Sequence, residues 1–181
     1  MLKQIGLQPK VSNNYQEILN SNELILPGVG NFERGMKNLS INSLDDAIVK
    51  AAAKGSRILG ICLGMHLLFE NSEEGTKKGL SLIKGNVKKF KFDNKIHKVP
   101  HMGWNYVSFK KTSKLYFPSI KKIKFYFAHS YYGVCQNNEN ISGLTSYGND
   151  FASIVEKKNI YGVQFHPEKS HKFGMRLFEQ F

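Results

Sequence analysis

Cys62 is the residue whose type and setting point most directly to covalent chemistry. It stands at the centre of Gly60-Ile61-Cys62-Leu63-Gly64, between an apolar run and a helix-prone segment. A nucleophile on a sharp strand-to-helix turn has this pattern, because flanking glycines let the chain turn without a Cβ clash. Unpaired N–H groups at the start of the helix also favour the thiolate. The pattern predicts a nucleophile at Cys62, whereas Cys135 lacks such flanks and is expected to be a buried hydrophobe.

A base and an acid follow far along the chain, in the segment Gly162-Val163-Gln164-Phe165-His166-Pro167-Glu168. Pro167 biases His166 toward extended backbone, and side chains two apart on an extended segment share a face. Glu168 can therefore reach the ring edge of His166 that does not face Cys62. A thiol nucleophile, a base and an orienting carboxylate are the three groups that thiol acyl transfer needs.

A glycine-rich turn, Gly28-Val29-Gly30, ends the apolar run Glu23-Leu24-Ile25-Leu26. At the end of a parallel strand it suits a backbone donor for the oxyanion of a tetrahedral intermediate, paired with the N–H of Leu63. A plain strand-to-helix turn is the alternative. A phosphate loop is disfavoured, because the run lacks both G-x-G-x-x-G and a Walker lysine.

Apolar strands alternate with helices in the first part of the chain, which indicates a parallel sheet covered on both faces. The sequence predicts one α/β domain over residues 1–181, with a mostly parallel central sheet, helices on both faces and an antiparallel extension. Strands are expected at residues 10–12, 23–26, 58–61, 86–92, 104–109, 125–128, 151–155 and 160–165. Helices are expected at residues 1–8 (the last turns of one), 15–19, 31–39, 44–54, directly after Cys62, and 171–181.

Composition limits the classes of protein. The chain has 181 residues, two cysteines and a formal charge of +12, with no signal-like start and no apolar stretch of membrane-spanning length. A cytoplasmic protein without a membrane partner is therefore expected. Of the 26 basic residues only Arg34, Arg57 and Arg176 are arginines. Because Arg is the usual residue for phosphate recognition, the charge does not indicate a nucleic-acid partner.

No metal site is expected. His97 and His101 are four residues apart, a spacing that suits two ligands on a helix. However, Pro100 lies between them and breaks helical geometry. The two cysteines also lack the paired spacing of a zinc site.

With these residues in hand, the chain resembles the class I glutamine amidotransferases, which have a flavodoxin-like α/β fold. The elbow at Cys62 and His166-Pro167-Glu168 carry this resemblance. Two other segments, Pro100-His101-Met102-Gly103-Trp104-Asn105 and Phe125-Tyr126-Phe127-Ala128-His129-Ser130-Tyr131, narrow it to the glutaminase subunits of imidazole glycerol phosphate synthases. The matching segments run through nearly the whole chain in family order.

The resemblance implies hydrolysis of L-glutamine to glutamate and ammonia by Cys62, His166 and Glu168, without a cofactor. It implies that ammonia passes directly to a separate (β/α)₈ synthase subunit. The residues implied for the oxyanion and the substrate are Gly28, Val29, Gly30, Leu63, His66, His129, Ser130 and Tyr131. The residues implied for the interface with the synthase subunit are Pro100, His101, Met102, Gly103, Trp104 and Asn105.

Three features differ from the family pattern. His66 stands where the family usually has a glutamine that helps to hold substrate. The chain begins near the end of the family's first helix, so that a central first strand is expected to be missing. His171-Lys172-Phe173 is similar to a paralogous group that supplies ammonia for amidination of surface-polysaccharide sugars. That group, a thiol peptidase on the same architecture, and an inactive remnant that still binds a partner are the alternative functions.

Overall fold

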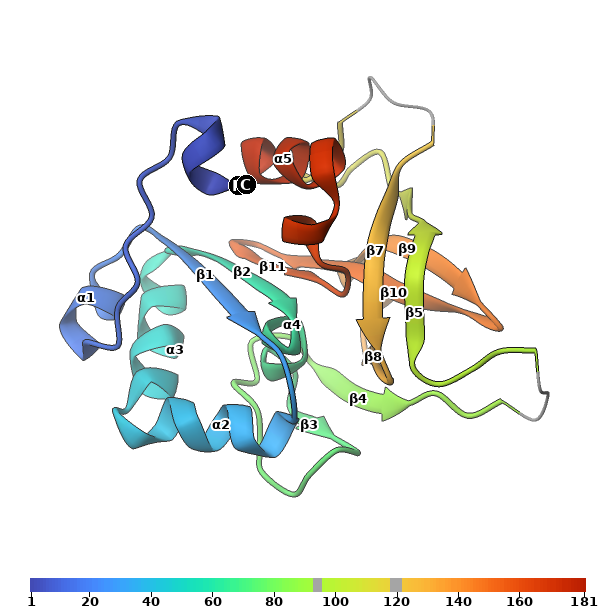
Figure 1. Ribbon diagram of the computed structural model, residues 1–181. Helices are drawn as coiled ribbons and strands as arrows, with labels where there is room; N and C mark the ends of the chain where they lie inside the picture. The colour runs from blue at the N-terminus through green and yellow to red at the C-terminus, as the bar shows by residue number, and fades with distance from the viewer. Residues whose placement is uncertain (93–95, 118–121) are drawn as a thin grey trace.

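The structure, a computed structural model, describes residues 1–92, 96–117 and 122–181 (Figure 1). Its strands are β1 (Glu23–Gly28), β2 (Arg57–Cys62), β3 (Asn71–Ser72), β4 (Gly85–Lys89), β5 (His101–Tyr106), β6 (Ser108–Phe109), β7 (Lys124–His129), β8 (Tyr131–Cys135), β9 (Ile141–Tyr147), β10 (Asn149–Lys157) and β11 (Ile160–Val163). Its α-helices are α1 (Tyr15–Leu19), α2 (Phe32–Ile41), α3 (Leu44–Lys54), α4 (Leu63–Leu67) and α5 (His171–Gln180), and its 3-10 helices are η1 (Leu2–Ile5), η2 (Asn138–Asn140) and η3 (Pro167–Lys169). None of these helices is long and apolar enough to cross a membrane.

The strands form one large mixed sheet and one separate ribbon. The large sheet has the order β1-β2-β11-β10-β8-β4-β3, with β9 paired to β10 and β6 paired to β9. Strands β1, β2 and β11 run parallel. Strand β10 pairs antiparallel with β11, β8 and β9, and β8 pairs antiparallel with β4, whereas β3 runs parallel to β4. Strands β5 and β7 form the antiparallel ribbon. The predicted α/β class is confirmed, and its parallel strands are the ones that lead to Cys62 and His166.

Alternate side chains of the parallel strands enter two apolar clusters, one on each face of the sheet. Leu59 and Ile61 of β2 enter the first cluster, and Ile58 enters the second. Helix α5 and η1 cover the first face, whereas α2, α3 and α4 cover the second (Figure 1). Burial of both faces explains why β2 is continuously apolar.

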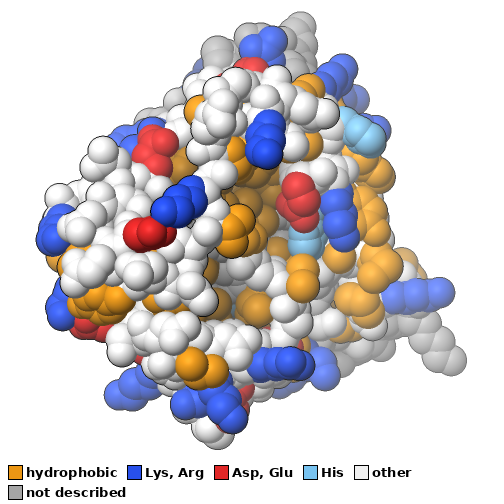
Figure 2. Space-filling view, turned by 60° about the vertical axis from the view of Figure 1, so that its left-hand side comes forward, with side chains coloured by type: hydrophobic (Ala, Val, Ile, Leu, Met, Phe, Trp, Pro, Cys, Tyr) orange, Lys and Arg blue, Asp and Glu red, His pale blue; other side chains and the backbone are white. Residues whose placement is uncertain are grey.

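Strand β1 lies at the edge of the large sheet, and among the described residues it pairs only with β2. Its apolar residues Leu24, Ile25 and Leu26 are only partly buried. Seen from this side, the surface is hollowed in the middle, and hydrophobic side chains line the hollow (Figure 2). The Lys and Arg side chains on this face are scattered and do not gather into one stripe.

Most predicted elements are present with shifted ends, and two predictions at the N-terminus are wrong. Residues 10–12 form no strand: Val11 is almost fully exposed, and Lys10 pairs with Glu17 of α1 instead. Residues 1–8 contain only the single 3-10 turn η1. The sequence analysis also missed β8 and β9, two strands of the antiparallel extension.

Helix α4 packs directly on the strands β1 and β2. A Cβ atom on Gly64 would overlap the carbonyl oxygen of Leu26 in β1. A Cβ atom on Gly60 would lie 2.6 Å from the carbonyl oxygen of Gly64. Both glycines of the elbow therefore permit a close approach of backbone to backbone, which any larger residue would prevent.

We predict that Gly64→Ala lowers the free energy of unfolding by about 4 kcal/mol or more, or prevents soluble expression, because backbone atoms cannot yield to the added methyl group. Gly35→Ala in α2 is the control. There the methyl group would meet only flexible side-chain atoms of Leu67 and Leu63. The control should change stability by no more than about 1 kcal/mol. Equal effects of the two substitutions in urea unfolding would contradict this account of the turn.

Candidate active site

Cys62 ends β2 and stands directly before α4, in a strained backbone conformation. Its φ of 53° and ψ of −108° lie in a region that residues with a Cβ rarely adopt. Such a conformation costs about 1–3 kcal/mol and persists only where the surrounding structure holds it. The parallel pairing of β1 with β2 places Gly28 directly beside Cys62. The turn after β1 and the predicted nucleophile are therefore neighbours.

His166 follows β11 and is held from two sides. Its backbone N–H donates to the carbonyl oxygen of Tyr126 in β7, at 2.8 Å. Its ring Nδ1 lies 2.6 Å from Oε1 of Glu168, which η3 places beside it. The ring is buried, while the Glu168 side chain is about half exposed. Because Glu168 occupies Nδ1, the nitrogen left to hydrogen-bond with Cys62 is Nε2.

The surroundings of His166 favour its protonated form at neutral pH. The hydrogen bonds of His166 with Cys62 and then with Glu168 raise the pKa of the imidazole to about 9, against the opposing effect of burial. Burial by itself would raise the pKa of Glu168, but the hydrogen bond from His166 and nearby positive charges lower it overall. His166 can therefore hold a proton next to sulfur and give it up during a reaction.

A cavity of about 390 Å³ opens in front of Cys62. It brings together the turn after β1, the start of α4, the end of the ribbon and the segment around His166. Its lining residues are Val29, Gly30, Cys62, Leu63, His66, Glu74, Pro100, Met102, Ala128, His129, Ser130, Tyr131, His166 and Lys169. Gly28 and Glu168 do not line the cavity themselves. Gly28 lies beside Cys62 in the sheet, and Glu168 hydrogen-bonds to His166.

His66 lines the cavity, yet one of its ring nitrogens is already engaged. Nε2 lies 2.7 Å from Oε1 of Gln164, and both side chains are buried. A carboxamide oxygen only accepts hydrogen bonds, so Nε2 carries the proton. Burial lowers the pKa of His66 to about 4, despite the opposing hydrogen bonds, so the ring is neutral at pH 7. This bond ties the helix that follows Cys62 to the strand segment that precedes His166.

Two more buried histidines, His101 of β5 and His129 of β7, are hydrogen-bonded to each other beside the cavity. Nδ1 of His129 donates to the carbonyl oxygen of Tyr131 at 2.7 Å, which leaves Nε2 as an acceptor. Nδ1 of His101 then donates to that Nε2 at 2.9 Å, and Nε2 of His101 faces the amide of Asn105. Burial lowers the pKa of His101 to about 4 and that of His129 well below its usual value. His101 was predicted to contact a partner, but its side chain faces the interior.

The sequence analysis missed Glu74, which also lines the cavity. Its Oε2 accepts a hydrogen bond from the backbone N–H of Phe32 at 2.8 Å, and its carbonyl oxygen accepts one from the side chain of Asn31. Partial burial raises the pKa of Glu74, against the hydrogen bond from Phe32. No local motif marks this residue, because a loop beyond β3 brings it to the start of α2. Lys169, which the sequence analysis did not single out, also lines the cavity.

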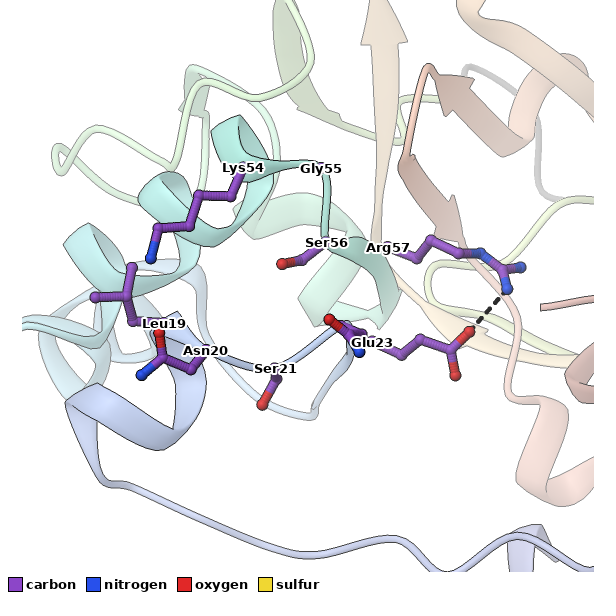
Figure 3. Close-up of a pocket in the computed structure, with 9 residues that line it drawn as sticks. Leu19, Asn20, Ser21, Glu23, Lys54, Gly55, Ser56 and Arg57 are labelled. Carbon is purple, nitrogen blue, oxygen red and sulfur yellow. Dashed lines mark hydrogen bonds and ion pairs between the residues drawn. The ribbon is translucent and has the colours of Figure 1, made fainter.

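A larger cavity, of about 730 Å³, lies at the opposite end of the parallel strands (Figure 3). Lys54, Glu23 and Arg57 supply its charged groups, and Arg57 pairs with Glu23 at 2.8 Å. Neither a cysteine nor a histidine lines it. The groups that could carry out covalent chemistry are therefore at the smaller cavity. Within the described segments, no cluster of His, Cys, Asp and Glu side chains could hold a metal ion.

Comparison with known proteins identifies the family. The sequence model of the class-I glutamine amidotransferases matches residues 1–181. The chain belongs to this family and is a glutamine amidotransferase. It is 51% identical to imidazole glycerol phosphate synthase subunit HisH 2 of Methanococcus maripaludis, over 100% of this chain and 90% of that relative. It is 46% identical to subunit HisH of Methanocaldococcus jannaschii, over 99% of this chain and 90% of the relative.

Solved structures show the same fold. A crystal structure of a glutamine amidotransferase superposes with a TM-score of 0.73 at 17% sequence identity, over 99% of this chain and 89% of that one. The structure of PurLQS from Thermotoga maritima gives a TM-score of 0.61 at 21% identity, over 86% of this chain and 77% of the matched chain. These likenesses support the α/β architecture.

The buried histidines predict that the protein loses stability in mild acid. Their pKa values are lowered in the folded state, so the unfolded chain binds more protons than the folded chain between about pH 6.5 and about pH 4. The stability that these buried histidines contribute is full above this window and falls as the pH drops through it. Each such histidine adds about 1.4 kcal/mol per pH unit to the slope.

Urea unfolding at a series of pH values checks this prediction. Replacing His101 with Gln should reduce the slope below pH 6.5 by about one proton. Ile41→Ala, at an exposed residue without a titratable group, is the control and should keep the slope of the parent chain. An unchanged slope in the His101 variant would contradict the neutral, buried state of that ring.

Proposed function

We propose that the chain is the glutaminase subunit of an imidazole glycerol phosphate synthase. It hydrolyses the side-chain amide of L-glutamine and delivers the ammonia to a synthase subunit that builds the imidazole ring in histidine biosynthesis. The observation that carries the proposal is the contact of Cys62 with the His166–Glu168 pair at one cavity. The names of relatives 40–51% identical over the whole chain support the pathway.

The reaction follows from the positions of the three side chains. The thiolate of Cys62 attacks the amide carbon of glutamine and forms a tetrahedral oxyanion. His166 gives its Nε2 proton to the leaving nitrogen, the C–N bond breaks, and ammonia and a γ-glutamyl thioester result. Neutral His166 then takes a proton from water, whose oxygen attacks the thioester and releases glutamate. Glu168 keeps the ring oriented and stabilises the imidazolium.

The oxyanion is stabilised by backbone N–H groups of the turn at Gly28, Val29 and Gly30, together with that of Leu63. Val29 is largely exposed, and Gly30 has a φ of 101°, a conformation that favours glycine. Both line the cavity beside Cys62. One such donor is commonly worth about 10² to 10³ in rate.

Substrate selection uses the charged ends of free glutamine. Glu74 lines the cavity, and a carboxylate there suits the α-ammonium group of the substrate. The segment His129-Ser130-Tyr131 and the neutral ring of His66 form the rest of the wall around the side-chain amide. The family match and the names of the relatives argue against the thiol peptidase alternative.

The remaining alternatives are less well supported. The names of the relatives favour imidazole glycerol phosphate synthase over the paralogous group that serves sugar amidination. The hydrogen bond between His166 and Glu168, and the cavity that Cys62 and His166 line together, favour an active enzyme over an inactive remnant.

The synthase subunit is proposed to be a (β/α)₈ barrel that docks on the outer face of the β5–β7 ribbon. Met102, Trp104 and Tyr106 alternate along β5 and are exposed on this face, as is typical of a protein interface. Lys124 and the ring of His171 contact Trp104. Pro100 and Met102 also line the cavity, so this face continues to the active site. The side chains of His101 and Asn105 turn inward and hydrogen-bond within the chain. These two residues are therefore left out of the proposed interface.

We predict that Cys62→Ser lowers glutamate release by about 10³-fold or more, because serine at this position lacks a thiolate. The assay combines the chain with the (β/α)₈ cyclase subunit of the same organism and measures glutamate from glutamine. Cys135→Ser is the control and should keep most of the activity, since Cys135 is buried away from the cavity. Activity retained in the Cys62 variant would contradict the proposed nucleophile.

We also predict that Trp104→Ala raises the Kd for the cyclase subunit by about 30-fold, as a loss of about 2 kcal/mol at a central aromatic residue implies. Isothermal titration calorimetry measures the affinity. Ile41→Ala on α2, also at an exposed apolar residue, should leave the affinity unchanged. Equal affinities of the two variants for the cyclase subunit would contradict the proposed docking face.

A further inference from the structure

Ser170 completes an unusual backbone contact of His166. Tyr126 and His166 form an isolated antiparallel bridge between β7 and the segment after β11. In such a hydrogen-bonded pair, two residues normally exchange both N–H···O bonds directly. Here one bond is direct, from the N–H of His166 to the carbonyl oxygen of Tyr126 at 2.8 Å. The reverse bond passes through a side chain: the N–H of Tyr126 donates to Oγ of Ser170 at 3.0 Å, and Oγ donates to the carbonyl oxygen of His166 at 2.6 Å.

The Ser170 hydroxyl therefore acts as a spacer of one oxygen atom between β7 and the backbone of His166. The Ser170 residue is fully buried, and it does not line the cavity. Without its hydroxyl, two buried backbone groups would lose their partner, or the bridge would close into a direct bond. Either change moves the backbone that carries the imidazole.

A helix-capping role does not explain this hydroxyl. Ser170 precedes the first residue of α5, a position where serine often caps a helix through its side chain. However, the Ser170 side chain makes no hydrogen bond to the N–H groups of α5. Both of its hydrogen bonds go to Tyr126 and His166.

We infer that Ser170 is a positioning residue, whose hydroxyl sets the place of His166 relative to Cys62. This inference rests on the proposed function, since it gives Ser170 a purpose in the same triad. Ser170 contacts neither the substrate cavity nor the sulfur atom, so its influence acts through the backbone of His166. A displacement of about 1 Å in such a group can cost 10²-fold in rate.

The test is the pH dependence of Cys62 alkylation by iodoacetamide, in variants of the full chain without glutamine or partner. The reaction is followed at the peptide that contains Cys62 by mass spectrometry. The parent chain gives the reference profile, in which the His166 ring lies beside the thiol. In Ser170→Ala, alkylation at pH 7 should slow about tenfold or more, because the displaced ring no longer assists the thiol. Ser170→Thr, which keeps the hydroxyl, should retain the parent profile.

Ser153→Ala is the matched control. Ser153 is also fully buried, and its hydroxyl accepts a hydrogen bond from Thr145, away from the cavity. This variant should lose stability but keep the alkylation profile. If Ser170→Ala does not fold, Ser170→Gly removes the same hydroxyl and carries the same expectation.

Steady-state kinetics with the cyclase subunit give a second readout. For Ser170→Ala we expect kcat to fall about tenfold or more while KM stays within about twofold, because substrate contacts are unchanged. Equal alkylation profiles for Ser170→Ala, Ser153→Ala and the parent chain would overturn the inference. A shifted profile in a chain that does not hydrolyse glutamine would instead contradict the proposed function and leave the positioning role standing.

Discussion

The direct contact of helix α4 with the backbone of β1 and β2 is the constraint on which the active site depends. Gly60 and Gly64 allow this contact, since a methyl group on either would meet backbone atoms. The short helix then forces Cys62 into its strained turn at the end of β2. The parallel pairing of β1 with β2 places Gly28 level with Cys62, so that the turn after β1 lies beside the proposed nucleophile. One packing contact thus brings together the proposed nucleophile and the backbone N–H groups that we propose as oxyanion donors.

Four histidines near the cavity have two different electrostatic tasks. His66, His101 and His129 are buried among apolar groups or neutral partners, which lowers their pKa values and keeps them uncharged. His166 lies between the carboxylate of Glu168 and the thiol of Cys62, and these two partners raise its pKa to about 9. The three neutral rings form fixed hydrogen bonds, and we propose that His166 exchanges protons during the reaction. Partners, more than burial alone, therefore decide which histidine can act as a base.

The sequence predicts those parts whose cause is local. The elbow at Cys62 and the pair of His166 and Glu168 depend on spacing along the chain, and both can be located from the sequence alone. The continuous apolar run of β2 likewise marks a strand buried on both faces. Glu74 and Ser170 could not be found in this way, because their partners are 42 and 44 residues away, at Phe32 and Tyr126. The strand predicted at residues 10–12 failed because one apolar residue without a buried neighbour cannot hold a strand.

The central claim is that Cys62 is the nucleophile toward glutamine. The most direct test is to incubate the complex with a diazoketone analogue of glutamine and to measure the mass of the intact chain by mass spectrometry. Such a reagent occupies the glutamine site and alkylates the nucleophile there. We predict a single adduct, located on the peptide that contains Cys62, and protection from labelling by excess glutamine. Labelling on Cys135, or no adduct in a complex that releases glutamate, would contradict the account.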